Sequence, residues 1–139
     1  MKKVLSLLFT LLTLCSHANA AKEGWIRLQA RTDDFELYYL PLSIQKLQDG
    51  KSQVSTLMNY KARNGNLLSI VTERLFDCSK KLKQDLSHVQ YDQQWGVGEV
   101  INTSGKENDW KEVPPETNGN RLLVLACGDT PATSTQLHR

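Results

Sequence analysis

The sequence is poor in cysteine and histidine, the residues that form most structural zinc sites. Its 139 residues include three of each, and neither Cys78 nor Cys127 has a histidine beside it. We therefore expect no metal site and no bound cofactor. His88 and His138 lie in polar stretches, which is typical of solvated surface side chains.

An excess of charge of either sign is also missing. The chain carries 17 basic and 15 acidic residues, and Lys2 and Lys3 belong to an amino-terminal export segment described next. Without these two lysines the basic and acidic residues balance. Nothing in this balance indicates the strong basic patch that nucleic-acid binding requires, so we expect no nucleic-acid partner.

Long apolar runs are absent beyond the first twenty residues. The run at residues 4–14 is shorter than the ~20 apolar residues that a membrane helix needs. It follows two lysines and precedes Ala18-Asn19-Ala20, which has the small-x-small pattern of a cleavage site. We predict a signal peptide at residues 1–20, Sec-dependent export to the periplasm or outer-membrane surface, and no transmembrane helix.

A lipoprotein is the alternative outcome of processing. Leu12-Thr13-Leu14-Cys15 resembles a lipoprotein box, in which Cys15 carries lipid and tethers the protein to a membrane. Leu14 is bulkier than the Gly, Ala or Ser that usually precedes such a cysteine. This difference favours a mature chain that begins at Ala21.

Cys78 and Cys127 are then the two cysteines of the mature chain. An exported chain meets an oxidising compartment, so an even pair indicates a disulfide. The alternatives are two free thiols or a metal site. A bridge between them would close a loop of about 50 residues, which the chain-entropy estimate values at roughly 4 kcal/mol.

The mature chain has the length of one ordinary domain, which we place at residues 21–129. A polar tail at residues 130–139 is predicted to be flexible. Alternation of apolar and polar side chains predicts several strands. They lie at residues 25–29, 35–40, 54–60, 67–78 and 99–102, with a hairpin turn at Asn64-Gly65.

Two segments allow more than one interpretation. At residues 79–90, Leu82, Leu86 and Val89 have helical spacing, and local propensity alone predicts a helix. Residues 121–127 are apolar all round, as in a buried helix that Thr117 or Asn118 caps and Gly128 ends. A buried strand is the competing interpretation there.

The apolar positions of the predicted strands and of the final helix indicate which side chains form the core. They are Trp25, Tyr39, Leu57, Phe76, Trp110 and Leu123.

Three groups of residues are candidates for a chemical site. Ser69 and His88 with an acid could form a triad, but Ser69 lacks the glycine pattern of a nucleophile elbow. Trp95-Gly96-Val97-Gly98 could be a ligand platform, although glycines more often mark a bulge or a close backbone approach. Lys80, Lys81 and Lys83 could form a basic patch, although such runs are usually a solvated face.

Several stretches in a fixed order resemble the surface-adhesin protein E family of Gram-negative bacteria. They begin with Trp25-Ile26-Arg27-Leu28 and Tyr38-Tyr39-Leu40-Pro41-Leu42-Ser43-Ile44, followed by Leu57-Met58-Asn59-Tyr60 and Phe76-Asp77-Cys78. Tyr91-Asp92-Gln93-Gln94-Trp95-Gly96-Val97-Gly98, residues 110–115 and Cys127 complete the series. The resemblance implies an α+β fold: an antiparallel sheet of about six strands with a C-terminal helix packed on one face. It also implies that residues 79–90 form a strand.

The resemblance further implies a non-enzymatic surface protein that binds host extracellular-matrix proteins such as vitronectin or laminin. In the family's characterised adhesins, basic residues near the hairpin before the central strand take part. The corresponding residues here are Lys61 and Arg63, with Arg74 on the adjoining strand. The alternative is a periplasmic structural or accessory protein that has no host ligand.

Overall fold

The computed structural model describes residues 22–28 and 34–128. The predicted signal peptide, Cys15, Ala21 and the polar tail lie outside the described residues, as do the side chains of Arg63 and Asn64. Within the described ranges, no helix is long and apolar enough to cross a membrane.

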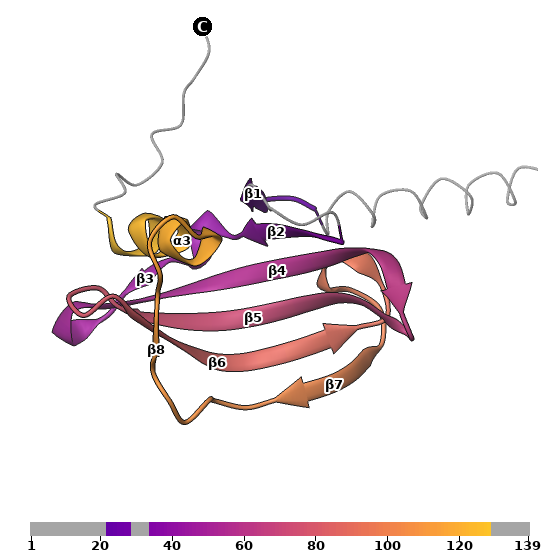
Figure 1. Cartoon of the computed structure of the whole chain (residues 1–139). Helices are drawn as coiled ribbons and strands as arrows, with labels where there is room; N and C mark the ends of the chain where they lie inside the picture. The colour runs from indigo at the N-terminus through magenta and orange to yellow at the C-terminus, as the bar shows by residue number, and fades with distance from the viewer. Residues whose placement is uncertain (1–21, 29–33, 129–139) are drawn as a thin grey trace, which may run out of the picture.

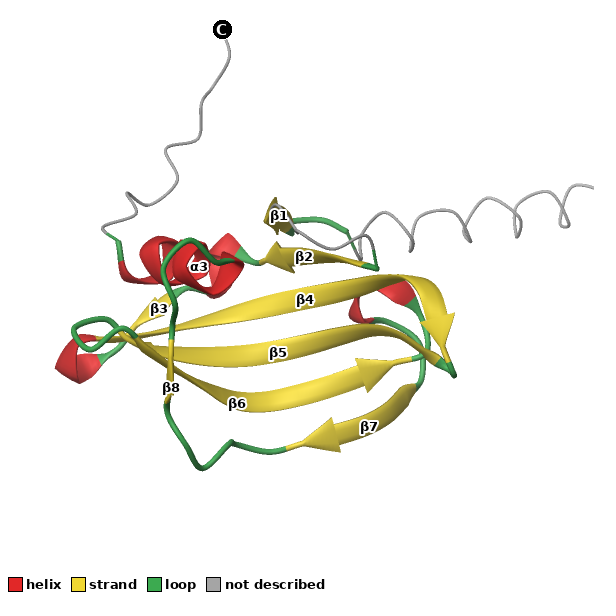
Figure 2. Ribbon diagram, viewed as in Figure 1, coloured by secondary structure: helices red, strands yellow, loops and turns green. Residues whose placement is uncertain are grey.

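An antiparallel sheet forms the body of the protein, in the order β1-β2-β4-β5-β6-β7 (Figures 1 and 2). Two further strands of two residues join it, β3 beside β4 and β8 beside β6. The strands are β1 (Ile26–Leu28), β2 (Phe35–Tyr39), β3 (Gln45–Lys46), β4 (Lys51–Asn64), β5 (Leu67–Asp77), β6 (Leu82–Tyr91), β7 (Val100–Ser104) and β8 (Lys111–Glu112). The 3-10 helices η1 (Pro41–Ser43), η2 (Gln48–Gly50) and η3 (Gln94–Gly96) lie between strands.

The predicted strands are confirmed, with different ends. β4 begins at Lys51 and runs to Asn64, beyond both predicted limits. Asn64 pairs with Leu67, so the hairpin turn is Gly65-Asn66, one residue later than predicted. Gly65 supplies the positive φ of this turn, at 62°.

The helix that local propensity predicts for residues 79–90 is wrong, because most of this segment forms the strand β6. The strand that the family resemblance implies is confirmed. Nine residue pairs join β6 to β5, and β7 and β8 pair with its other edge. The register shifts between Glu73 and Arg74, where β6 accommodates Leu86 as an extra residue. Sheet hydrogen bonding on both edges outweighs the weak helical preference of this segment.

The C-terminal helix, α3 (Asn118–Cys127), lies across one face of the sheet (Figure 1). The Thr117 hydroxyl caps it by accepting a hydrogen bond from the Asn120 N–H at 3.2 Å. Gly128 ends it in an extended rather than left-handed conformation, with its N–H donating to the Val124 carbonyl. The helix is not buried all round, because Val124 faces away from the sheet and is 59% exposed.

The main core lies between α3 and the sheet. It consists of Leu28, Tyr39, Val54, Phe76, Val113, Leu122, Leu123 and Ala126. Leu57 is also fully buried, but strand alternation places it on the opposite face of the sheet. Trp25 and Trp110 are only half-buried, contrary to the prediction, because each lies in a segment just before a marginal strand, β1 or β8.

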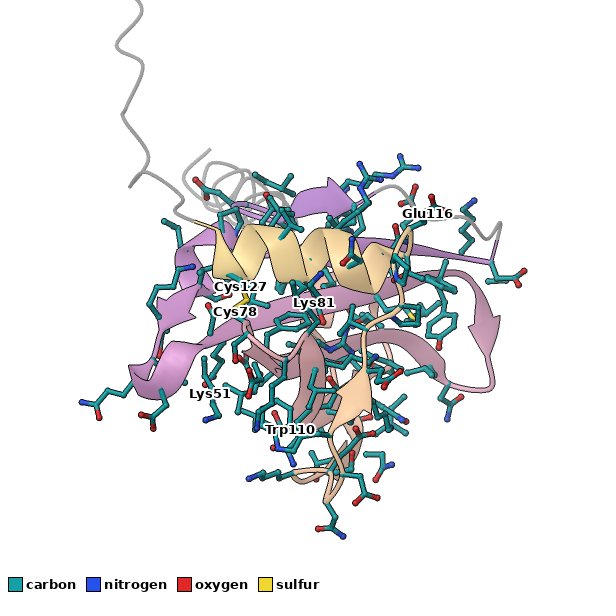
Figure 3. All side chains as sticks on the ribbon, turned by 60° about the vertical axis from the view of Figure 1, so that its left-hand side comes forward. Lys51, Cys78, Lys81, Trp110, Glu116 and Cys127 are labelled. Atoms are coloured by element: carbon teal, nitrogen blue, oxygen red, sulfur yellow. A yellow bond between two sulfur atoms is a disulfide. The ribbon has the colours of Figure 1, made fainter. Side chains whose placement is uncertain are left out.

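A disulfide and two hydrogen-bonding side chains fasten the end of α3 to the sheet. Cys78 in the β5–β6 turn is bonded to Cys127, the last residue of α3 (Figure 3). The Ala126 carbonyl accepts hydrogen bonds from the Ser52 hydroxyl at 2.6 Å and the Lys46 ammonium at 2.7 Å. The helix C-terminus thereby receives both donors and a positive charge, which its unpaired carbonyls favour.

Replacing Phe76 with Ala should lower the free energy of unfolding by about 3–5 kcal/mol, because the side chain is fully buried under α3 and its loss leaves a cavity. Urea denaturation measures the change. Leu42→Ala, at a position 84% exposed, is the control and should shift stability by less than about 0.5 kcal/mol. A cost below about 1 kcal/mol for Phe76→Ala would contradict the described core.

Removing the disulfide in a Cys78→Ser/Cys127→Ser variant should cost about 4 kcal/mol, because the bridge joins residues 49 positions apart and restricts the unfolded chain. Thermal and urea unfolding of the variant would be compared with the oxidised protein. Mass mapping without reductant should find both cysteines in one linked peptide pair. Equal stability of the two proteins would contradict this role.

Candidate binding site

The β4–β5 hairpin projects from the end of the sheet opposite the disulfide (Figure 1). Lys61 lies near this end of β4 and is exposed, and its backbone N–H donates to the Asp34 carbonyl at 3.0 Å. Gly65 and Asn66 at the tip are exposed as well. The hairpin can therefore present Lys61 to a partner without any change in the core.

Arg74 is not brought together with Lys61. It stands opposite Val54 in the register, seven residues along β4 from Lys61, or about 23 Å at ~3.3 Å per residue. Its guanidinium donates to both carboxylate oxygens of Asp85, with Nη2 3.0 Å from Oδ2. The two side chains are only 15% and 9% exposed, so Arg74 belongs to an internal ion pair.

Asp85 is the centre of a small polar cluster on the helix side of the sheet. The His88 Nε2 lies 3.6 Å from Asp85 Oδ2, and the Thr72 hydroxyl is 2.9 Å from His88 Nδ1. Burial raises the pKa of Asp85, but the hydrogen bond and charge of Arg74, with the Lys83 charge, lower it below its usual value overall. Asp85 is therefore ionised at neutral pH.

Asp85, His88 and Glu107 also place possible metal-ligand atoms within 4.8 Å of one another. Both oxygens of Asp85 are engaged by Arg74, however, and Glu107 Oε1 is 2.8 Å from the Lys111 ammonium. The carboxylates are already neutralised by neighbouring cations. This arrangement is that of an ion-pair network and disfavours a divalent cation.

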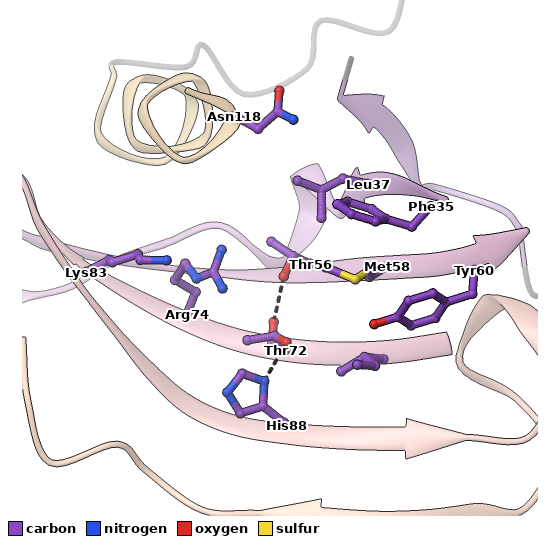
Figure 4. Close-up of a pocket in the computed structure, with 11 residues that line it drawn as sticks. Phe35, Leu37, Thr56, Met58, Tyr60, Thr72, Arg74, Lys83, His88 and Asn118 are labelled. Carbon is purple, nitrogen blue, oxygen red and sulfur yellow. Dashed lines mark hydrogen bonds between the residues drawn. The ribbon is translucent and has the colours of Figure 1, made fainter. Parts of the chain in front are cut away.

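A groove of about 360 Å³ lies beside this cluster on the same face, where α3 leaves the sheet uncovered (Figure 4). We call it the sheet groove. Its walls come from alternate residues of four neighbouring strands and from the first residue of α3: Phe35, Leu37, Thr56, Met58, Tyr60, Ile70, Thr72, Arg74, Lys83, His88 and Asn118. One end is apolar and aromatic, and the other carries cations and a histidine.

Lys83 is separated by the fold from the other lysines of its sequence run. Lys80 and Lys81 are exposed in the β5–β6 turn, whereas Lys83 is half-buried in β6 and lines the groove. Burial lowers the pKa of Lys83, and the charge of Arg74 lowers it further. The three lysines therefore do not form one patch.

The Trp95–Gly98 segment covers the opposite face of the sheet. A Cβ on Gly96 would lie 2.7 Å from a Val71 methyl carbon. The backbone at Gly96 therefore lies too close to β5 for any side chain, which is the close backbone approach expected of this glycine. Trp95 lies against Tyr38 with ring centroids 4.9 Å apart, and the Lys22 ammonium lies 5.1 Å from the Trp95 ring centroid. The segment is packed in place by backbone and aromatic contacts.

Ser69 is part of the support for this segment and is fully buried. Its hydroxyl donates to the Gln93 carbonyl and accepts from the Gly96 N–H at 3.0 Å. Strand alternation puts Ser69 on the face opposite Thr72 and His88. A catalytic triad of Ser69 and His88 is therefore not assembled.

Sequence reasoning missed the sheet groove. Alternation within the predicted strand at residues 54–60 puts Val54, Thr56 and Met58 on one face, but their neighbours on β2 and β6 depend on strand order and register. The available signal was Lys83, which follows Leu82 at the end of the lysine run. It could not be separated from Lys80 and Lys81 until the turn was placed.

Replacing Asp85 with Asn should lower the free energy of unfolding by about 3 kcal/mol at pH 7, because it leaves Arg74 without its buried counter-ion. The pKa of Asp85 is lower in the folded than in the unfolded chain. The ionised carboxylate therefore stabilises the fold fully at a pH above its unfolded-state pKa of ~3.9, and this stabilisation is lost as the pH falls through the folded-state pKa. Urea denaturation from pH 7 down to pH 2 should show the two proteins converging. The exposed Glu99→Gln is the control, and a gap that stays constant with pH would contradict the assignment.

Comparisons with known proteins give one family and one fold. The family model described as Surface-adhesin protein E matches residues 25–128. Two structures of Haemophilus influenzae protein E are similar to this chain. Crystal form II has 17% sequence identity and a TM-score of 0.60, and the match covers 76% of this chain and 87% of that chain. The selenomethionine form has 16% identity and a TM-score of 0.61, and the match covers 77% of this chain and 88% of that chain. At these identities the likeness shows the fold alone. No curated protein sequence matches the chain.

Proposed function

Because the chain belongs to the surface-adhesin protein E family, we propose that it is an exported binding protein of the cell surface that attaches to host extracellular-matrix protein, with vitronectin and laminin as the first candidates. The observation that carries this proposal is the family match at residues 25–128, which includes every described strand and α3. The family is one of surface adhesins and points to a non-enzymatic role.

The two ends of the sheet differ in a way that supports a binding role: α3 is held at one end, and the other end is left uncovered. The Cys78–Cys127 bridge, Lys46 and Ser52 hold α3 at one end of the sheet. At the other end, the β4–β5 hairpin carries the exposed Lys61 beyond the core. Loops held by a rigid scaffold are the usual position for binding residues.

We place the contact surface on this hairpin, at Lys61 and Arg63. The balanced charge of the mature chain means that attraction must come from a local group of charges rather than from the field of the whole protein. Arg74 is left out of this surface, since Asp85 already pairs with it. The signal-like residues 1–20 and the disulfide support export to an oxidising compartment.

Binding of the purified protein to immobilised vitronectin or laminin should weaken as salt rises from 50 to about 300 mM, because exposed charges are screened beyond about 10 Å at 0.1 M salt. A Lys61→Ala/Arg63→Ala variant should bind about fivefold more weakly at low salt, from ~0.5 kcal/mol per exposed ion pair. Its melting temperature should be unchanged.

The matched control is Lys80→Ala/Lys81→Ala, which removes two exposed lysines at the disulfide end. This variant should bind like the unmodified protein. Protease shaving of intact cells, followed by detection of the chain, tests surface exposure. Absence of saturable binding to either matrix protein at low salt, with protection from shaving, would support the periplasmic accessory role instead.

A further inference from the structure

The sheet groove has no acidic residue among the side chains that line it, although it contains Arg74, Lys83 and His88. Figure 4 shows Arg74 and Lys83 together at one end and Phe35 and Tyr60 at the other. The groove thus combines an excess of positive charge with an apolar wall. This polarity is independent of the hairpin and of the adhesive role.

Lys83 is the cation at the basic end that has no directly paired carboxylate among the described residues. Asp85 has both oxygens engaged by Arg74, and Glu107 is paired with Lys111. Among the described residues, no carboxylate forms a salt bridge with the half-buried Lys83 ammonium. Partial burial disfavours an ammonium that has no directly paired counter-ion, so an anion that reaches Lys83 would be stabilised there.

The start of α3 adds to this preference. Asn118, its first residue, lines the groove, and the first turn of α3 contains no acidic side chain. The partial positive charge at the start of α3 therefore lies near the groove, and no acidic side chain of the first turn offsets it. Thr72 and His88 supply further polar atoms beside the same end.

The apolar wall follows the strand direction. Lys83 pairs with Phe76 on β5, and Ile70 lies six residues further along that strand, or about 20 Å at ~3.3 Å per residue, a gap that the Lys83 side chain partly spans. Met58 is the partner of Ile70 on β4. Tyr60 and Phe35, whose rings are 6.3 Å apart, extend the wall further. The groove is accordingly a strip along the strands, with room for one unbranched chain.

We propose that the sheet groove binds a free medium-chain fatty acid, with its carboxylate at Lys83 and its acyl chain directed along the strands toward Ile70 and Met58. A volume of about 360 Å³ is at the lower end of small-molecule pockets, about 300–1,000 Å³, and suits a single chain rather than a two-chain lipid. One carboxylate matches the one unpaired ammonium.

Calorimetric titration at pH 7 with octanoate and decanoate, below their aggregation concentrations, tests the proposal. Affinity should rise about fourfold per added methylene while the chain still lies in the groove. The neutral probe 1-decanol and the cationic probe decyltrimethylammonium should bind at least tenfold more weakly than decanoate. Equal affinity for decanol and decanoate would overturn the ionic part of the proposal, and no saturable decanoate binding would overturn all of it.

Lys83→Met should reduce decanoate affinity at least tenfold and make it equal to that of decanol, whereas Lys80→Met, an exposed lysine of the adjoining turn, should leave it unchanged. Should Lys83→Met fail to fold, amide chemical shifts of the unmodified protein decide the matter. Decanoate should perturb Ile70, Thr72 and His88, and not Gly65 or Asn66 of the hairpin. Unchanged affinity in Lys83→Met, or shifts confined to other surfaces, would refute the site.

Discussion

The attachment of α3 to one end of the sheet determines which surfaces of this protein are free. The helix is only ten residues long and cannot cover a sheet whose central strands have ten to fourteen residues. The Cys78–Cys127 bridge and the donors Ser52 and Lys46 fix it over Val54 and Phe76. The groove is open and the hairpin is uncovered because both occupy the part of the sheet that α3 does not reach.

Strand alternation then gives the two faces different chemistry. On β5, Ser69 and Val71 support the Trp95–Gly98 segment, while Thr72 and Arg74 face the groove. Ser69 is an example, since its hydroxyl forms hydrogen bonds with the Gln93 carbonyl and the Gly96 N–H and is not available to the groove. Neighbours in sequence therefore belong to separate environments, and a motif that spans both faces cannot act as one site.

The sequence predicted the strands and the helix better than it predicted which side chains would lie together. Alternation located β2, β4 and β5, and Thr117 marked the start of α3, because these signals are local. The helical spacing of Leu82, Leu86 and Val89 was misleading, since a bulge in β6 absorbs Leu86 and pairing on both edges fixes the strand. The groove depends on register between four strands, and the pairing of Arg74 with Asp85 depends on the shifted register of β6, which no local signal encodes.

The disulfide also has a mechanical consequence for the adhesive role proposed above. Cys78 and Cys127 are 49 positions apart, and β6, η3, β7, β8 and α3 all lie between them. Tension that pulls on the chain on either side of this segment passes through the sulfur–sulfur bond. These elements cannot be drawn out into a longer chain under load, and of the strands that the structure describes only those before Cys78 can yield.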